Sequence, residues 1–274
     1  MKKIIFHDKL KIITNKKITD NIYNLKFSSE KLNDVKAGQF IFIDCVTSLD
    51  RNNCLWGPTL LKRPFSFYLI NNEKKEYEIL YRIKQYGTGT NCLTNLKPND
   101  EINFLGPLGK PIDFNELDKS KKIYLIAGGM GIAPITFLAQ SLKLSGYDIE
   151  VIFGNKIYDD FTKFCINKLT DIIKSYEIHI AIDINNNDCN SFVGNVLDLI
   201  KCKYYNLIPG PSFVCGPEPM MKEIHNLSKE TIHSCYVFLE RRMACGMGVC
   251  NSCDCNGKKV CTDGPCIKSN EVFD

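Results

Sequence analysis

The sequence is poor in histidine and tryptophan, and its charge is nearly balanced. Of its 274 residues, 35 are Lys or Arg and 31 are Asp or Glu, which leaves a formal net charge of only +4. So weak a field does not indicate a nucleic-acid partner. An apolar fraction of 44% is ordinary for a globular protein, and the length corresponds to roughly two domains of about 100–150 residues. We therefore expect a folded, enzyme-sized protein.

A continuous apolar segment long enough to cross a membrane is also missing. Residues 123–142 carry no charge, but Gly128, Gly129, Gly131 and Pro134 interrupt the run. This pattern is typical of a buried strand, a glycine turn and a helix. Near the N-terminus, Asp8 stands where a signal peptide would need uninterrupted apolar residues. We expect no membrane span, no export and a cytoplasmic location.

Cysteine, in contrast, is abundant. Half of the fourteen cysteines fall in the last forty residues: Cys235, Cys245, Cys250, Cys253, Cys255, Cys261 and Cys266. The disulfide framework of a secreted protein usually belongs to a shorter chain with cysteines throughout. Ligation of a metal or cluster is therefore the better interpretation of the concentrated set, and we interpret the scattered cysteines as structural.

Residues 1–118 are predicted to form an antiparallel β domain. Short segments rich in β-branched and aromatic residues are separated by turn residues, and no convincing amphipathic helix lies among them. This pattern favours a small barrel or sandwich. The expected strands are 11–18, 21–27, 39–46, 65–70, 77–83 and 101–106.

From residue 119 the pattern changes to strands that alternate with helices. Alternation predicts a doubly wound parallel sheet, because parallel strands need crossover connections. The expected strands are 121–128, 148–155, 176–183 and 211–216, and the expected helices are 134–144, 159–169, 191–200 and 217–230. Residues 119–232 would form this second domain. Residues 233–274 are too few to bury their own core, so we expect a third unit that depends on bound metal.

The spacing of four cysteines indicates a [2Fe–2S] cluster. Cys245, Cys250 and Cys253 follow the C-x4-C-x2-C pattern of plant-type ferredoxins, and Cys261 would supply the fourth thiolate from a following strand. Gly246 would help the loop to turn its amides toward the sulfides. Structural zinc is the alternative, although a zinc ribbon usually has a second C-x2-C knuckle, which this sequence lacks.

Two neighbouring cysteines stay unassigned at this stage. Cys255 would point away from the cluster if the chain is extended there, and Cys266 lies beyond a turn at Asp263-Gly264-Pro265. The four histidines all lie outside this segment, which argues against a Rieske centre.

Two strand-to-helix junctions suggest a nucleotide site in the second domain. Glycines at such junctions let a phosphate-bearing cofactor approach the backbone and the helix N-terminus. The spacing is not that of the usual dinucleotide fingerprint, so a packing turn remains the alternative. The candidate residues are Gly128, Gly129 and Gly131 at the first junction, and Cys215, Gly216 and Pro217 at the second.

A third group of motifs lies in the β domain. Two arginines and a Gly/Thr turn offer donors suited to a pyrophosphate, and a tyrosine could lie against a flat ring. Surface arginines beside a hairpin turn are the alternative interpretation. The candidates are Arg63, Pro64, Phe65, Ser66, Leu80, Tyr81, Arg82, Gly87 and Thr88.

In chain order, RPFS, YR…GT, GGMGIAP, CGPEPM and CGMGVCNSC…VCTDGP resemble the ferredoxin–NADP reductase superfamily. More closely, they resemble the electron-transfer subunits of NAD-linked bacterial dihydroorotate dehydrogenases. The resemblance implies an FAD-binding barrel, a nicotinamide-nucleotide domain and a [2Fe–2S] unit. It also implies FAD contacts at Arg63–Ser66, Leu80–Arg82 and Gly87–Thr88, nicotinamide contacts at both junctions, and Cys245, Cys250, Cys253 and Cys261 as cluster ligands.

The same resemblance implies a function. A partner subunit would oxidise dihydroorotate at its own FMN, within a heterotetramer, for pyrimidine biosynthesis. Electrons would then pass singly through the cluster to FAD and on to NAD⁺. We expect no acid–base catalytic residue in this chain, and we expect the C-terminal unit to meet the partner. The absence of an arginine cluster at Gly154-Asn155-Lys156 favours NAD over NADP.

Two departures from the resemblance keep alternatives open. The interval from Cys253 to Cys261 is shorter than we expect, and residues 49–60 look like an insertion. The short interval is shared by diaphorase subunits that oxidise NAD(P)H and feed sulfite reductase, hydrogenase or ferredoxin. A redox sensor or zinc-stabilised binding module on the same scaffold is a further, non-enzymatic alternative.

Overall fold

The structure is a computed structural model that describes residues 5–45, 62–83, 88–174, 177–184, 191–204, 208–231 and 233–274, with only the backbone described for Thr88. Gly87, predicted to contact FAD, and the predicted insertion at 49–60 lie outside the described residues.

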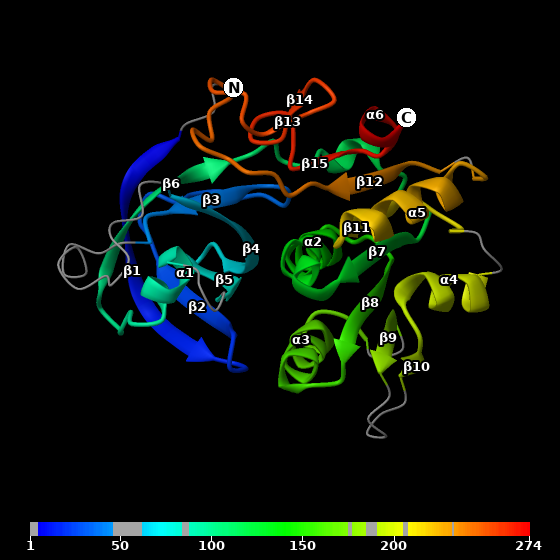
Figure 1. Ribbon diagram of the computed structural model, residues 1–274, viewed down its shortest axis with the longest axis horizontal. Coiled ribbons are helices and arrows are strands. Elements are labelled where there is room, and N and C mark those ends of the chain that lie inside the picture. Colours follow the sequence, from blue (N-terminus) through cyan, green and yellow to red (C-terminus); the bar gives the residue numbers. More distant parts are fainter. Residues whose placement is uncertain are drawn as a thin grey trace.

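Within the described ranges, six strands of the N-terminal half close into an antiparallel barrel (Figure 1). The sequence predicted either a barrel or a sandwich, and the structure shows the barrel. Apolar side chains of alternate residues, such as Leu25 and Phe27, fill its interior with no exposed surface. In barrel order the strands are β1 (Phe6–Lys17), β2 (Ile22–Ser28), β5 (Glu76–Arg82), β4 (Arg63–Asn71), β3 (Phe40–Ile43) and β6 (Glu101–Leu108). A short helix, α1 (Thr88–Leu93), follows β5.

The second half contains the predicted parallel sheet. The strand order is β10-β9-β8-β7-β11-β12-β15, parallel except for β15. The strands are β7 (Ile123–Gly128), β8 (Ile149–Ile157), β9 (Ile178–Ile184), β10 (Phe192–Val193), β11 (Ser212–Cys215), β12 (Cys235–Phe238) and β15 (Cys266–Lys268). Helices α2 (Ile132–Leu144) and α3 (Asp160–Thr170) lie on the barrel side, and α4 (Val196–Tyr204) and α5 (Glu218–Ser228) lie on the other side (Figure 1).

One predicted helix starts differently in the structure. The prediction of a helix over 191–200 is wrong for its first residues, because Phe192 and Val193 form strand β10 and helix α4 begins only at Val196. Phe192 pairs with Ala181 of β9, and Gly194 has a φ of 138° that no helix accommodates.

Helix α2 joins the barrel to the sheet. Phe137 packs edge-on against Phe67 of β4 with ring centroids 6.2 Å apart. The Gln140 side chain donates to the carbonyl of Ile70 at 3.0 Å and accepts from its amide at 3.3 Å. Buried side chains of the barrel, α2 and α3 form one continuous core. The start of α2 is therefore held against the barrel wall, where the first cavity described below lies.

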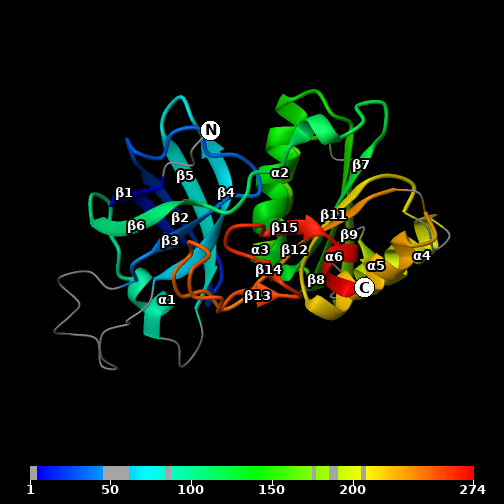
Figure 2. The same cartoon turned by 90° about the horizontal axis from the view of Figure 1, so that it is seen from above.

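The cysteine-rich segment is built onto both halves. Strand β12 extends the parallel sheet, and β15 pairs with it from the other side. Between them, Gly246 lies so close to Phe42 and Leu108 of the barrel that a Cβ would come within 3.0 Å of both. Seen from above, this segment lies across the junction of barrel and sheet (Figure 2). A small hairpin, β13 (Asp254–Cys255) and β14 (Lys258–Lys259), and helix α6 (Asn270–Phe273) complete it.

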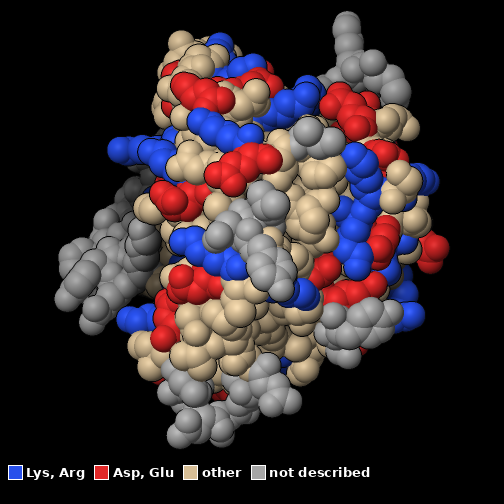
Figure 3. Space-filling model, turned by 90° about the vertical axis from the view of Figure 1, so that its right-hand side faces the viewer, with Lys and Arg blue, Asp and Glu red and all other residues tan. Residues whose placement is uncertain are grey.

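No helix among the described residues is long and apolar enough to cross a membrane. The face that carries α4 and α5 shows basic and acidic side chains interspersed (Figure 3), in keeping with the net charge of +4.

Candidate functional site

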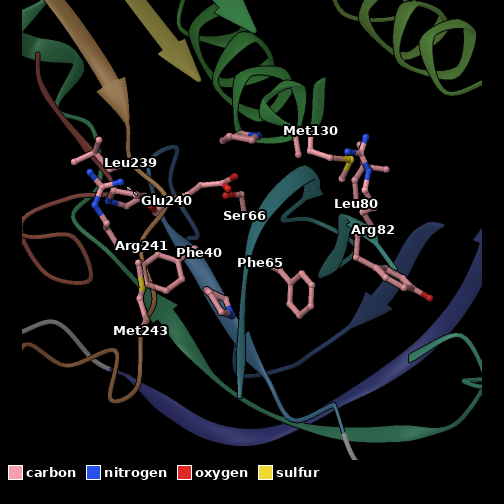
Figure 4. A pocket seen from close by; sticks show the side chains of 15 residues that line it. Phe40, Phe65, Ser66, Leu80, Arg82, Met130, Leu239, Glu240, Arg241 and Met243 are labelled. Carbon is pink, nitrogen blue, oxygen red and sulfur yellow. Dashed lines mark hydrogen bonds between the residues drawn. The ribbon is translucent and has the colours of Figure 1, made fainter. Parts of the chain in front are cut away.

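A cavity of about 290 Å³ lies between the barrel, the start of α2 and residues 239–243. We call it the barrel cavity. Strands β4 and β5 supply six residues that the sequence predicted: Pro64, Phe65, Ser66, Leu80, Tyr81 and Arg82. In Figure 4, Arg82 and Leu80 lie on one side of this space and Arg241 on the other, with Phe65 and Phe40 between them. The structure thus brings these predicted residues together.

The remaining predicted residues of this group are placed differently. Arg63, the first residue of β4, is not among the residues that line the barrel cavity. Its Nε lies 3.2 Å from the position of a Cβ on Gly89, so Arg63 packs beside α1. Tyr81 lines the cavity, but its ring stacks on Tyr23 at 5.3 Å and its hydroxyl donates to Asn15 at 3.0 Å. Burial raises the pKa of Tyr81 well above its ordinary value.

Nine lining residues were missed by the sequence analysis as individual contacts. They are Phe40, Met130, Ala133, Pro134, Leu239, Glu240, Arg241, Met243 and Pro265. Met130 to Pro134 belong to the glycine motif, and Leu239 to Met243 directly precede the first cluster cysteine. Their proximity to the motifs in the sequence was the feature that could have indicated these residues. Only the tertiary packing, however, brings these segments to one cavity.

A second space, of about 590 Å³, opens at the carboxyl ends of β7, β8 and β11. We call it the nucleotide cleft, because open α/β sheets bind nucleotides at this edge. Gly128, Gly129 and Pro217 line it as predicted. Arg82 lines both this cleft and the barrel cavity. The two spaces are therefore neighbours that share one arginine.

Three predicted nicotinamide contacts lie behind the cleft instead. A Cβ on Gly131 would come within 2.2 Å of the Cys215 carbonyl oxygen, and one on Gly216 would lie 3.1 Å from the Cα of Gly128. Cys215 is buried at 3% exposure. These residues are not among the lining set of the cleft. In the structure they let the two strand-to-helix junctions pack closely, which is the packing alternative that the sequence left open.

The cleft has an acidic lining that the sequence analysis did not identify. Asp159, Asp183 and Glu223 line it together with the cations Lys156 and Arg82. Asp159 caps helix α3 by accepting from the Thr162 amide at 2.9 Å. Asp183 stands exposed at the end of β9. A carboxylate at this edge suits a ribose hydroxyl better than a phosphate.

The four cysteines of the predicted cluster form two pairs. Cys245 lies close enough to Cys250 for the two thiols to influence each other's pKa, and Cys253 lies equally close to Cys261. Cys261 also lies within electrostatic range of Cys245. It occupies a turn directly after β14 rather than a strand, which corrects the prediction for the fourth cysteine.

A tight turn explains the short interval before Cys261. Asn256 and Gly257 both have positive φ, 51° and 76°, as a two-residue hairpin turn requires. The hairpin β13–β14 thereby folds the chain back, so that Cys261 returns to Cys253 after only seven intervening residues.

Backbone amides of the loop point at the sulfurs. The Met247 amide donates to Cys245 Sγ at 3.4 Å, and the Gly248 amide donates to Cys261 Sγ at 3.2 Å. Gly246 and Gly248 have φ of 69° and 77°, a conformation that favours glycine. Hydrogen bonds from Ser252 lower the pKa of Cys250 to about 6. A hydrogen bond from the backbone amide of Met247 lowers the pKa of Cys245. Burial raises the pKa of Cys261 to about 11.

This donor set fits a two-iron cluster. Each iron of a [2Fe–2S] cluster takes two thiolates, and the structure offers two thiol pairs on one amide-lined loop. Tetrahedral zinc, in contrast, would bring all four ligands to a single metal ion.

Cys255 lies in strand β13, so the chain is extended at this residue. An extended chain was the condition under which the sequence predicted that Cys255 points away from the cluster. Its Sγ accepts a hydrogen bond from Arg241 at 3.1 Å. Cys266 lies in β15, where burial raises the pKa of its thiol.

Comparison with known proteins agrees with this geometry. Residues 9–112 match the family model of the oxidoreductase FAD-binding domain, and residues 240–273 match that of the iron–sulfur cluster binding domain of dihydroorotate dehydrogenase B. The electron transfer subunit of dihydroorotate dehydrogenase B (NAD⁺) from Listeria innocua is 31% identical over 270 residues, which cover 96% of this chain and 97% of the relative. The chain belongs to this family of electron transfer subunits.

Other members and solved structures extend the likeness. The electron transfer subunit from Clostridium perfringens is 30% identical, with 96% of both chains covered. Among solved structures, an NADH-dependent reduced ferredoxin–NADP oxidoreductase superposes with a TM-score of 0.75 at 22% identity, over 96% of this chain and 89% of the other. The b5 reductase region of human Ncb5or superposes with a TM-score of 0.67 at 17% identity, over 86% and 70%. These structures share the fold.

Family membership confirms the resemblance found in the sequence. The chain is an iron–sulfur flavoprotein oxidoreductase subunit with an FAD-binding domain and a [2Fe–2S] domain. The alternative of a diaphorase subunit for sulfite reductase, hydrogenase or ferredoxin is not favoured, because full-length relatives are subunits of dihydroorotate dehydrogenase B.

Proposed function

We propose that this chain carries electrons from an FMN-containing catalytic subunit, which oxidises dihydroorotate, to NAD⁺, and that the two subunits assemble as a heterotetramer in the cytoplasm. When bound, FAD exchanges a hydride with nicotinamide and single electrons with an iron–sulfur cluster, so it belongs between the two. The chain itself supplies the positions of the three sites. A reducing compartment suits the free thiols of its cluster loop.

The observation that carries this proposal is the order of the sites along the molecule. The nucleotide cleft and the barrel cavity meet at Arg82. The far wall of the barrel cavity is formed by residues 239–243, and Cys245 follows two residues later. Nucleotide, flavin and cluster can therefore be held in sequence by one chain, with the flavin in the middle.

Individual residues have distinct tasks on this proposal. Phe65, Ser66 and Leu80 would hold the flavin, and the guanidinium of Arg63 would neutralise part of the charge of its pyrophosphate. Gly128, Gly129 and Pro217 would let the nicotinamide nucleotide approach the backbone. Asp183 would accept a ribose hydroxyl and select NAD over NADP. Cys245, Cys250, Cys253 and Cys261 would ligate the cluster.

The loop that carries these cysteines also suits a partner interface. Met247 and Val249 are exposed at 51% and 77%, although both are apolar. They stand between Cys245 and Cys250. An electron that reaches the cluster from another protein has to cross at such a place, so we propose that the catalytic subunit covers this loop.

An anaerobic titration of the purified chain with NADH, followed by absorption spectroscopy, tests the route. We expect flavin and iron–sulfur bands that bleach together. A chain without flavin, or with flavin but no iron–sulfur band, would contradict the proposal. The matched variant Cys250→Ser should lose the normal cluster spectrum while NADH still bleaches the flavin. Adding dihydroorotate and the catalytic subunit should then reduce the flavin of the wild type but not that of the variant.

A further inference from the structure

The side chain of Arg241 links the barrel cavity to helix α5 and to the hairpin β13–β14. Its Nη1 lies 3.1 Å from Glu218 Oε2, in the first turn of α5, directly after the second junction of the nucleotide cleft. Its Nη2 donates to Cys255 Sγ at 3.1 Å, two residues beyond the predicted ligand Cys253. The same side chain lines the barrel cavity (Figure 4).

The chemistry of this bridge suits arginine alone. A guanidinium presents its donors in a planar fork, so its two Nη groups can serve two acceptors in different directions. A lysine has a single ammonium at the end of a flexible stem and would reach one acceptor at a time. The exposed fractions of the Arg241 and Glu218 side chains are 26% and 41%. An ion pair this open contributes little to the stability of the fold.

We propose that Arg241 is a positioning residue that clamps the cluster-bearing hairpin to helix α5 and so sets the approach of the cluster to the barrel cavity. This inference rests on the proposed function. Among the described residues, Arg241 is the side chain that ties the hairpin β13–β14 to α5 through a polar contact. The hairpin is also tied to α6, where Asn256 donates to the Val272 carbonyl at 2.7 Å and Lys258 pairs with Glu271. Electron transfer between two cofactors depends steeply on their separation, so a small displacement of the hairpin slows it.

The test separates position from charge with two substitutions of the holoprotein. Arg241→Met removes both the fork and the charge, whereas Arg241→Lys keeps the charge. Stopped-flow mixing with NADH measures flavin bleaching first and cluster bleaching second, and a potentiometric titration followed by electron paramagnetic resonance measures the cluster potential. We expect both variants to slow cluster reduction on the order of tenfold, which is equivalent to about 1.4 kcal/mol in the barrier. We expect Arg241→Lys to keep the wild-type potential.

Two further variants test the clamp from the side of helix α5. Glu218→Gln breaks the clamp from the α5 side and should slow cluster reduction as Arg241→Lys does. Lys222→Gln is the matched control, because Lys222 also pairs with Glu218, at 3.3 Å, but has no contact with the hairpin. It should leave the rate unchanged. Thermal unfolding of each chain shows whether a variant is folded.

The outcomes are distinct. Cluster reduction at the wild-type rate in Arg241→Lys and Glu218→Gln would overturn the clamp. Slow reduction in Arg241→Met alone, with a lowered potential, would also overturn it and assign the effect to charge. If NADH fails to reduce the flavin of the wild type, the proposed function fails rather than the clamp.

Discussion

Asp183 offers a direct test of nucleotide choice. It lies next to the last residue of β9 at the rim of the cleft and is exposed, and the cations among the described lining residues are Arg82 and Lys156. Its carboxylate would accept from a ribose hydroxyl and would repel a 2′-phosphate. The position is readable only in the folded chain, since nothing in residues 176–183 marks this aspartate as a cleft residue.

We expect Asp183→Ala to raise the KM for NADH and to reduce the preference for NADH over NADPH by about tenfold, the equivalent of roughly 1.4 kcal/mol. Steady-state reduction of an artificial acceptor with each nucleotide measures this ratio. The control Glu230→Ala removes an exposed carboxylate beyond α5. An unchanged ratio in Asp183→Ala would remove this residue from the specificity site.

The two strand-to-helix junctions hold the nucleotide domain together as a packed pair. Gly131 has an ordinary helical φ of −60°, so a side chain there meets no backbone strain. It does meet the Cys215 carbonyl oxygen, 2.2 Å from the position of a Cβ. Space, rather than conformation, requires glycine at this position.

We therefore expect Gly131→Ala to lower the free energy of unfolding by about 1–3 kcal/mol, the usual cost of overpacking. Denaturant unfolding of the chain measures it. Gly129→Ala is the comparison, because no atom lies within 4 Å of its Cβ position and its φ of 54° adds only a local backbone cost, about 1 kcal/mol. Equal or greater destabilisation in Gly129→Ala would contradict the packing explanation.

At the opposite end of the sheet, Glu150 of β8 ties three elements together. It accepts from His179 Nε2 at 2.7 Å, from Lys203 Nζ at 2.8 Å and from the Tyr204 hydroxyl. Burial alone would raise its pKa, but these hydrogen bonds outweigh burial and hold the pKa well below its ordinary value of 4.5. The ionised form therefore stabilises the folded state.

The sign of the pH dependence follows. A depressed carboxyl pKa contributes stability that is complete above the unfolded value and is lost as the pH falls below it, from about pH 5 downward. Glu150→Gln should be less stable at neutral pH by about 1–3 kcal/mol, and its stability should fall less steeply on acidification. Urea unfolding at several pH values measures this, with the exposed Glu101→Gln as control. A parallel pH profile in Glu150→Gln would show that another group is responsible.

Assembly with a catalytic subunit depends on the surface that this folded chain leaves exposed. The cavity and the cleft lie where the barrel and the sheet meet, and the cluster loop lies across this junction and exposes Met247 and Val249. On the proposed function, electrons enter this chain at the cluster and leave it at the nucleotide cleft. The catalytic subunit would therefore meet the cluster loop.

Val249→Lys should therefore weaken assembly with the catalytic subunit by at least about tenfold, as a buried, unpaired charge costs more than 1.4 kcal/mol. Size-exclusion chromatography of the mixed subunits measures assembly. Reduction of the flavin by NADH should be unaffected. Leu144→Lys, at the end of α2 and 84% exposed, is the matched control. Normal assembly of Val249→Lys would move the interface away from this loop.

Much of the architecture follows from local features of the sequence. Most strands of the barrel and sheet were predicted within a few residues, because hydrophobic periodicity depends on neighbours along the chain. Strand β1 begins five residues earlier than expected, and β12 and β15 were not predicted. The spacing from Cys245 to Cys253 is equally local, and it identified the cluster loop. Residues 192–193 were missed, because a two-residue strand exists only through its pairing with β9.

Packing between distant segments determined the rest. Gly128 and Gly131 are three residues apart in one motif, yet the first lines the cleft and the second packs against Cys215. Leu239 to Met243 became a cavity wall because β12 joins the sheet beside β11. Local patterns specify which elements form, but the residues that share a cavity depend on contacts between segments far apart in the chain, and those exist only after folding.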